Sequence, residues 1–163
     1  DFKALEKTRI TIVLDNIRSG LNVGSAFRTA DAFALEQICL CGITAKPPHR
    51  EILKTAIGAT DSVDWVHYET TQSAIEALQE VGYQIWGVEQ TDSSVSLQAV
   101  VAEPEQAIAL VFGNEVSGLS DDILPFLDQC IEIPQFGTKH SLNISVCLGV
   151  VVWELFKQQK LGG

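Results

Sequence analysis

The sequence predicts an α/β fold in which a mostly parallel sheet carries helices on both faces. Short β-branched or apolar runs alternate along the 163 residues with segments of helical periodicity, a pattern typical of parallel strands joined by crossover helices. Glycine and polar residues gather where strands are followed by helices, which is where such sheets bind ligands. The composition, 46% apolar and 20% charged, is that of an ordinary globular chain. We expect residues 1–163 to form one domain.

Six short segments are predicted as strands because they are rich in β-branched and apolar residues. They are 9–17, 37–43, 63–69, 83–89, 106–113 and 129–135. The stretch 93–100 is ambiguous between strand and helix.

The four cysteines, Cys39, Cys41, Cys130 and Cys147, lack the Cys-x-x-Cys spacing of a metal or redox site. Cys39 and Cys41 point to one face of a predicted strand, and Cys147 lies in an apolar helix. We therefore expect four reduced core residues and no metal site.

Helical spacing of apolar residues predicts five helices. They are 23–33, 51–59, 70–82, 120–128 and a final helix from Ser141 to about Lys160. The helix at 70–82 has Thr70 or Thr71 as its N-cap and Gly82 beyond its end. The final helix is apolar nearly all round until its last turn, so we expect it to be buried on most sides and to contribute to a subunit interface.

The charges are divided unevenly along the chain, whose formal net charge is −10. All eleven Lys and Arg residues lie in 1–54 or 139–163, together with seven acidic residues, whereas 55–138 has fourteen acidic residues and no cation. An acidic chain is a poor general binder of polyanions, but a local positive surface would form if the two basic ends met. The longest apolar stretch, 142–156, is too short to cross a bilayer, and we expect no charged-then-apolar signal sequence before the first strand. We therefore expect a cytoplasmic protein without membrane contact.

The first of three notable junctions is 15–33, "DNIRSGLNVGSAFRTADAF". Asn22 stands just before the predicted helix, and Arg28 lies one to two turns inside it. Asn22 fits the role of helix N-cap, and Arg28 that of a surface or interface residue. Alternatively, the helix N-terminus and the Arg28 guanidinium form an anion site suited to phosphate.

The second junction is 110–124, "LVFGNEVSGLSDDIL". Gly113 and Gly118 bracket a polar loop and permit unusual backbone angles, and Gly113 would let a ligand approach the main chain closely. Glu115 has no evident role in the core or in capping a helix. The loop matches neither the dinucleotide nor the NTP fingerprint. It is therefore either a plain turn with an exposed glutamate or a ligand-binding loop.

The third junction is 133–145, "IPQFGTKHSLNIS". Ser141 is expected to be the N-cap of the final helix. A catalytic Ser141–His140 pair is disfavoured, because adjacent side chains in an extended segment diverge and no acid stands nearby to orient the histidine. The remaining interpretation is a pocket floor made by the main chain of 133–142, with Ser141 and Asn143 facing inward.

Together these junctions resemble the three motifs of the SpoU (TrmH-type) family of RNA ribose 2′-O-methyltransferases, in the SPOUT superfamily. The first motif, an Asn, a Gly and then Arg-Thr-Ala in a helix, corresponds to Asn22, Gly24 and "RTADAF" from Arg28. The second, a strand ending in Gly-x-Glu-x-x-Gly, corresponds to "FGNEVSGL". The third, Ile-Pro, a short loop and Ser-Leu-Asn opening an apolar helix, corresponds to "IPQFGTKHSLNISVCLG". The motifs occur in order, and the resemblance covers essentially the whole chain.

The resemblance implies a domain whose C-terminal part is tied into a deep trefoil knot, a topology that general rules exclude. It implies a homodimer that transfers a methyl group from S-adenosylmethionine to a ribose 2′-hydroxyl of tRNA or rRNA, leaving S-adenosylhomocysteine. No separate RNA-binding domain is expected within 1–163. The choice of RNA, and a possible accessory protein, stay open.

The resemblance also assigns site residues. The catalytic residues would be Arg28, Asn22, Glu115, Ser141 and Asn143, with Arg28 holding the target phosphate and stabilising the developing 2′-oxyanion or acting with that phosphate as proton acceptor. The cofactor would contact Val88, Glu89, Phe112, Gly113, Asn114, Glu115, Gly118, Ile133, Pro134, Ser141 and Leu142. The RNA backbone would contact Arg9, Arg18, Lys46, Arg50, Lys54, Lys139 and His140, consistent with the basic ends of the chain.

Two other functions are weighed against this one. A protein of the same fold that binds RNA in an assembly without catalysis is disfavoured by the intact motif residues. A Rossmann-type nucleotide enzyme would need a Gly-rich first turn and an acid about 20 residues later, which "NIRSGLNVG" does not provide.

Overall fold

The computed structural model describes residues 6–137 and 141–163. At its centre is a seven-stranded sheet in the order β3-β2-β1-β6-β4-β7-β5, with every neighbouring pair parallel. The strands are β1 (Thr8–Asp15), β2 (Leu35–Cys41), β3 (Trp65–Tyr68), β4 (Gln84–Val88), β5 (Val95–Ser96), β6 (Ile108–Phe112) and β7 (Gln129–Glu132). The predicted α/β fold with a parallel sheet is confirmed. The ambiguous stretch 93–100 holds both the short strand β5 and a 3₁₀ turn, Leu97–Ala99.

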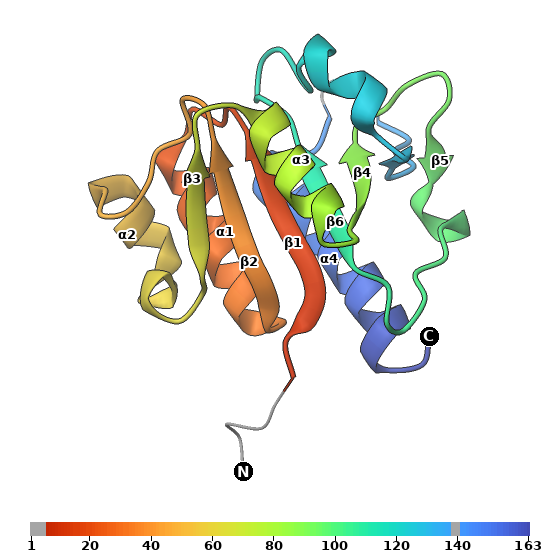
Figure 1. Ribbon diagram of the computed structural model, residues 1–163, viewed down its shortest axis with the longest axis horizontal. Helices are drawn as coiled ribbons and strands as arrows, with labels where there is room; N and C mark the ends of the chain where they lie inside the picture. The colour runs from red at the N-terminus through yellow and green to blue at the C-terminus, as the bar shows by residue number, and fades with distance from the viewer. Residues whose placement is uncertain (1–5, 138–140) are drawn as a thin grey trace.

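Helices cover both faces of this sheet. Those of the described residues are α1 (Gly20–Ala32), α2 (Arg50–Ala56), α3 (Thr71–Glu80) and α4 (Ile144–Lys160). In Figure 1, α3 lies in front of the sheet, and α1 and α4 lie behind it. Strand β1 feeds both layers, because Ile12 and Leu14 belong to the core that includes α1 and α4, whereas Val13 belongs to the core that includes α3. This division follows from the alternation of side chains along a strand.

Helix α1 begins earlier than predicted, and Asn22 is not its cap. Ser19 is the N-cap, and its hydroxyl accepts a hydrogen bond from the Asn22 N–H at 3.1 Å. Asn22 therefore lies in the first turn of the helix. Serine and asparagine are equally good caps, so residue type alone does not choose between them.

Helix α4 begins later than predicted, and Ser141 is not its cap. Asn143 is the N-cap, and its Oδ1 accepts a hydrogen bond from the Ser145 N–H at 2.8 Å. Thr70, one of the two predicted caps of α3, does cap that helix. The predicted helix at 120–128 is a 3₁₀ turn, Asp121–Phe126, with a proline inside.

Helix α4 is buried on one face, not on most of its circumference. Leu148, Val151, Val152 and Leu155 are at most 2% exposed. Val146, Val150 and Trp153, spaced at four and three residues, are 52%, 40% and 46% exposed. These three side chains form an exposed apolar stripe along the helix.

The four cysteines are free, but only two are fully buried. Cys39 and Cys41 lie in the core beneath α3. Cys130 and Cys147 are half-buried. Cys147 still packs against the core, whereas Cys130 belongs to neither core cluster, so the expectation of four core cysteines is wrong for Cys130. Within the described residues, no helix has both the length and the apolar character needed to cross a membrane.

Candidate functional site

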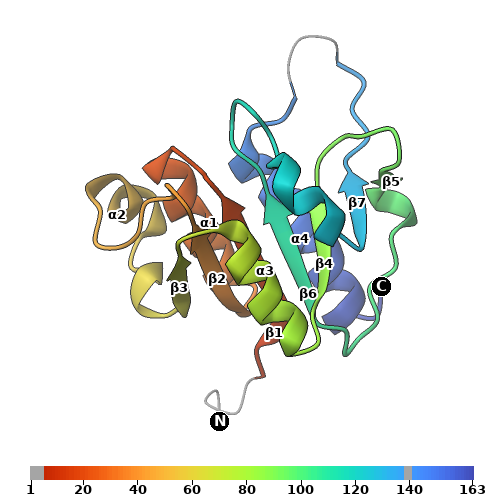
Figure 2. The ribbon, with the colours of Figure 1, turned by 45° about the horizontal axis from the view of Figure 1, so that its top comes forward.

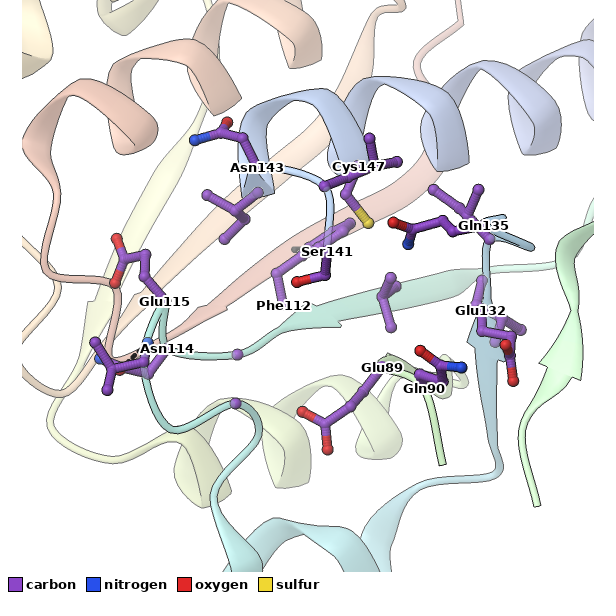
Figure 3. A pocket seen from close by; sticks show the side chains of 18 residues that line it. Glu89, Gln90, Phe112, Asn114, Glu115, Glu132, Gln135, Ser141, Asn143 and Cys147 are labelled. Carbon is purple, nitrogen blue, oxygen red and sulfur yellow. Dashed lines mark hydrogen bonds between the residues drawn. The ribbon is translucent and has the colours of Figure 1, made fainter. Parts of the chain in front are cut away.

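A pocket of about 590 Å³ opens at the carboxyl ends of β4, β6 and β7. Its walls come from 88–90, 112–118, 131–135 and 141–147 (Figure 3). Figure 2 shows the described ends of the connection from β7 to α4 standing above this edge of the sheet. Small-molecule sites have volumes of about 300–1,000 Å³, and parallel sheets of this kind bind ligands at this edge.

The pocket brings together ten of the eleven residues that were predicted to contact the cofactor; Pro134 does not line it. The ten are Val88, Glu89, Phe112, Gly113, Asn114, Glu115, Gly118, Ile133, Ser141 and Leu142. Asn143, predicted as catalytic, lines the pocket as well.

The pocket is also lined by seven residues that the sequence analysis did not single out. Most adjoin the predicted residues along the same segments, and Cys147 follows Asn143 by four residues, which places both on one side of α4. The seven are Gln90, Val116, Ile131, Glu132, Gln135, Ile144 and Cys147.

The pocket combines apolar walls with carboxylates, and none of the described residues that line it is Lys or Arg. Glu89 accepts a hydrogen bond from the Leu119 N–H through Oε1 at 2.8 Å, and Glu132 accepts one from the hydroxyl of Ser94. In Figure 3 the Cys147 sulfur points into the pocket. Burial raises the pKa of the Cys147 thiol to about 11, so this thiol is uncharged at pH 7.

Glycine is required twice in the loop that follows β6. Hydrogen bonds from Asn114 N–H to Gly118 C=O (3.0 Å) and from Gly118 N–H to Asn114 C=O (2.9 Å) close the loop. A Cβ on Gly113 would lie 2.3 Å from the Gly118 carbonyl carbon. Glycine at 113 therefore lets the two ends of the loop approach each other closely enough to form these bonds. Gly118 has φ +74°, and a Cβ there would lie 2.4 Å from Glu89 Oε1. Of the two, only Gly118 uses the left-handed backbone region.

Glu115 points from this loop to the start of α1, so the expectation that it caps no helix is wrong. Its Oε1 accepts a hydrogen bond from the Arg18 N–H, and its Oε2 accepts one from the Ser19 N–H, both at 3.0 Å. Burial alone would raise the pKa of Glu115, but the bonds from the Arg18 and Ser19 main chain outweigh it and hold the pKa below its ordinary value. The carboxylate is therefore ionised at neutral pH, where it complements the positive end of the helix dipole.

A chain of side-chain hydrogen bonds joins the three junctions. Asn22 Nδ2 donates to Glu115 Oε2 at 3.4 Å, and Ser145 Oγ donates to Asn22 Oδ1 at 2.8 Å. Ser145 in turn donates its N–H to Asn143 Oδ1. We call Glu115, Asn22, Ser145 and Asn143 the junction network.

Asn143 stands at the end of the junction network. The Asn143 Nδ2 makes no hydrogen bond to any other described residue, and Asn143 lines the pocket. Ser145 was not predicted, because nothing in the local sequence shows that its hydroxyl meets a residue 123 positions earlier.

Arg28 does not line the pocket of its own chain. It is exposed on α1 and follows Leu21 by seven residues, so the two share one side of the helix. Leu21 is 42% exposed. Arg28 therefore lies on an outer face of the molecule.

The residues predicted to contact RNA are dispersed. Arg18 is exposed, and its N–H bond to Glu115 places it at the rim of the pocket. Arg9 lies at the opposite end of β1, with its Nε 4.0 Å from Glu36. Lys46, Arg50 and Lys54 are exposed in or before α2, beyond the β3 edge of the sheet (Figure 1). Lys139 and His140 lie outside the described residues.

Across residues 6–137 and 141–163, no group of three or more His, Cys, Asp and Glu side chains is placed to hold a metal ion.

Known proteins resemble this chain over nearly its whole length. It is 31% identical over 162 residues to an uncharacterized tRNA/rRNA methyltransferase, slr0955, of Synechocystis, covering 96% of this chain and 40% of the relative. It is 28% identical to the tRNA (guanosine(18)-2′-O)-methyltransferase of Borreliella burgdorferi, covering 93% of this chain and 67% of the relative. The chain thus spans less than half of the Synechocystis relative.

Solved structures share the fold. The TrmH/SpoU tRNA modifying enzyme of A. aeolicus superposes with a TM-score of 0.84 at 25% identity, over 97% of this chain and 79% of that one. The SpoU methyltransferase AviRb from Streptomyces viridochromogenes, crystallised with AdoMet, gives a TM-score of 0.84 at 22% identity, over 98% of this chain and 64% of that one.

The sequence profile of the SpoU rRNA Methylase family matches residues 9–153. That span includes all three motifs and every lining segment of the pocket. The protein belongs to the SpoU family of RNA methyltransferases, in the SPOUT superfamily.

Proposed function

We propose that this chain transfers a methyl group from S-adenosylmethionine to a ribose 2′-hydroxyl of tRNA or rRNA. The observation that carries this proposal is the position of the pocket, which directly adjoins the junction network. A cofactor site and a set of polar groups able to orient a sugar therefore meet at one place. The names of relatives support the same reaction, because one of them methylates a guanosine at its 2′-oxygen.

The pocket fits S-adenosylmethionine in both polarity and charge. Its apolar walls, which include Phe112, Ile133 and Leu142, suit the adenine ring. The main-chain N–H groups of Gln135 and Leu142 make no hydrogen bond to another described residue, so they are available to a ligand. The carboxylates of Glu89 and Glu132 suit a ligand that carries positive charge. When bound there, the cofactor supplies a methyl group already activated by a positive sulfur.

The protein then has to position the ribose and lower the cost of removing its proton. The junction network is suited to positioning, because Glu115 and Ser145 fix the Asn22 amide and leave the Asn143 Nδ2 free to donate to the sugar. Ser141 lines the pocket beside Asn143 and offers a second hydroxyl contact. Arg28 would hold the target phosphate and stabilise the developing 2′-oxyanion.

We infer that a homodimer brings Arg28 to the pocket. Val146, Val150 and Trp153 of α4 form an exposed apolar stripe, and Leu21 shares the outer side of α1 with Arg28. A second copy packed on these surfaces would bury the stripe and carry its own Arg28 into the interface. The role of Arg28 would then be exercised across two subunits.

Mixing subunits tests this arrangement. Arg28→Ala lacks the guanidinium, and Ser141→Trp fills the pocket, so each variant alone should be inactive. Random mixing makes half of the dimers heterodimers with one working site each, so we expect roughly a quarter of wild-type activity. An inactive mixture of folded, dimeric variants would show that Arg28 does not act across the interface.

We further propose that the connection through β7 to α4 forms the trefoil knot. Strand β7 lies between β4 and β5 in the sheet, and the chain then returns to α4, which packs on β1. A cytoplasmic location stays a prediction from the sequence.

Two measurements test the proposed reaction. Calorimetry should show binding of S-adenosylmethionine, and labelled cofactor should transfer methyl groups to bulk tRNA or bulk rRNA. Mass-spectrometric mapping of 2′-O-methylribose would then identify the nucleotide. Cofactor binding without transfer to either RNA would favour the alternative, an RNA-binding or assembly protein of the same fold. The exposed position of Arg28, which does not line the pocket of its own chain, agrees with that alternative.

A further inference from the structure

Phe136 is the most exposed large apolar side chain among the described residues, at 97%. Phenylalanine is usually buried, and nothing in the described part of the chain covers this ring. Phe136 directly follows Gln135, which lines the pocket.

The second most exposed side chain of this kind stands at the same place. Val116 is 86% exposed and lines the pocket from the loop after β6, whereas the next in rank, Val101, is 67% exposed. Two apolar side chains from different segments are therefore left in water beside one site. Exposed apolar groups that gather at a site mark a binding contact.

The position of Phe136 limits what it can contact. It does not line the pocket, but it is one residue beyond the wall, and neighbouring Cα atoms are about 3.8 Å apart. Its ring is therefore better placed to contact a part of a ligand that extends out of the pocket than a part held inside it.

A nucleotide whose ribose enters the pocket has two parts that stay outside it, a phosphate and a base. Arg18 stands at the rim as a cation for phosphate. Phe136 offers no charge and no hydrogen bond, only an apolar aromatic face. Unpaired bases of RNA are commonly held by stacking on such faces.

We propose that Phe136 stacks on the base of the unpaired nucleotide whose ribose enters the pocket. This inference rests on the proposed function and adds to it the form of the substrate, a base turned out of its helix or already in a loop. Because every base has a π-face, the contact tolerates any base and selects for an unpaired one.

The variants Phe136→Ala, Phe136→Leu and Phe136→Tyr separate stacking from other roles. Val81→Ala is a matched control, because Val81 is 64% exposed and lies just before β4, at the amino ends of the strands. The probe is a short fluorescein-labelled oligouridylate in the presence of S-adenosylhomocysteine, with affinity measured by anisotropy.

Loss of stacking should weaken binding about 5-fold or more in the alanine and leucine variants, while the tyrosine variant and the control bind as wild type does. An abasic oligomer of the same length, which keeps the phosphates, should bind all five proteins equally. The salt dependence should be the same for wild type and Phe136→Ala, because no cation is removed.

Equal oligouridylate affinity in wild type and Phe136→Ala would overturn the inference, as would a wild type without affinity for the oligouridylate. A change in the sedimentation of the RNA-free alanine variant would assign Phe136 to a contact between subunits instead. Cofactor calorimetry and methyl transfer by the wild type distinguish a failure of the proposed function from a failure of the role of Phe136. If both are absent the proposed function fails, and if both are present while the alanine variant binds normally, only the role of Phe136 fails.

Discussion

Glu115 links the pocket loop to the start of α1, and its replacement tests how much that link stabilises the fold. Its two carboxylate oxygens accept hydrogen bonds from the main-chain N–H groups of Arg18 and Ser19 at 3.0 Å. In Glu115→Gln one oxygen remains, and the new NH₂ group faces a main-chain donor. Loss of a helix cap costs about 0.5–2 kcal/mol, and solvent screens a carboxylate as exposed as this one. We expect a loss of about 1 kcal/mol in the free energy of unfolding at neutral pH.

The size of this loss should depend on pH. Burial alone would raise the pKa of Glu115, but the bonds from Arg18 and Ser19 hold it below the ordinary value of 4.5. A carboxylate whose pKa is lower in the folded state adds stability above its unfolded pKa, and this stability is lost as the pH falls through the folded pKa. The difference between wild type and Glu115→Gln should therefore be constant near neutral pH and shrink as the pH falls below 4.5.

Urea unfolding followed by circular dichroism, at neutral pH and at several acidic values, measures this difference. Glu105→Gln is the matched control, because Glu105 is exposed and makes no hydrogen bond or ion pair with another described residue. The control replacement should leave the free energy of unfolding nearly unchanged at every pH. A loss for Glu115→Gln that stays the same down to strongly acidic pH would refute the assigned role of the carboxylate.

Two further replacements and one chemical modification probe the site. Ser145→Ala removes the donor to Asn22 and should lower kcat without changing the calorimetric affinity for S-adenosylmethionine, because Ser145 does not line the pocket; Ser145→Thr, which keeps the hydroxyl, should restore kcat. Gly118→Ala should lower the free energy of unfolding by about 1–3 kcal/mol in denaturant titrations, since φ is +74° and the new Cβ would meet Glu89, whereas Gly137→Ala, whose Cβ meets open space, should change little. Cys147 should be alkylated slowly at pH 7 and faster as the pH approaches its raised pKa of about 11. Bound cofactor should block this alkylation, and peptide mass spectrometry measures both effects.

The parallel sheet and the place of the pocket were predictable because both follow from local patterns. Strand and helix periodicities occur within about ten residues, and the carboxyl ends of parallel strands share one edge. The three junctions were therefore expected at one edge of the sheet, and the strand order, with β6 and β4 between β1 and β7, decides how close they come. The individual lining residues were assigned from the resemblance to the SpoU family, because this rule predicts the edge of the sheet and not the residues.

The hydrogen-bond partners within the site were not predictable in the same way. The N–H groups that Glu115 accepts from lie 96 and 97 residues earlier in the chain, so no local pattern reveals its capping role. The helix starts were missed for a related reason. Ser19 and Asn22 are both acceptable caps, and only the packed position of α1 decides between them.

The uneven charge of the chain matches the layout of the site. The pocket is lined from the stretch without Lys or Arg and from the start of α4, and three lining residues are glutamates, Glu89, Glu115 and Glu132. Such carboxylates favour a cationic cofactor and repel a phosphate. An RNA bound here must therefore keep its phosphates at the rim, near Arg18, and turn a single ribose inward. Among the described residues, Arg18 is placed at this rim as a cation. We expect stacking at Phe136, and a second copy of the chain, to add to the affinity for RNA.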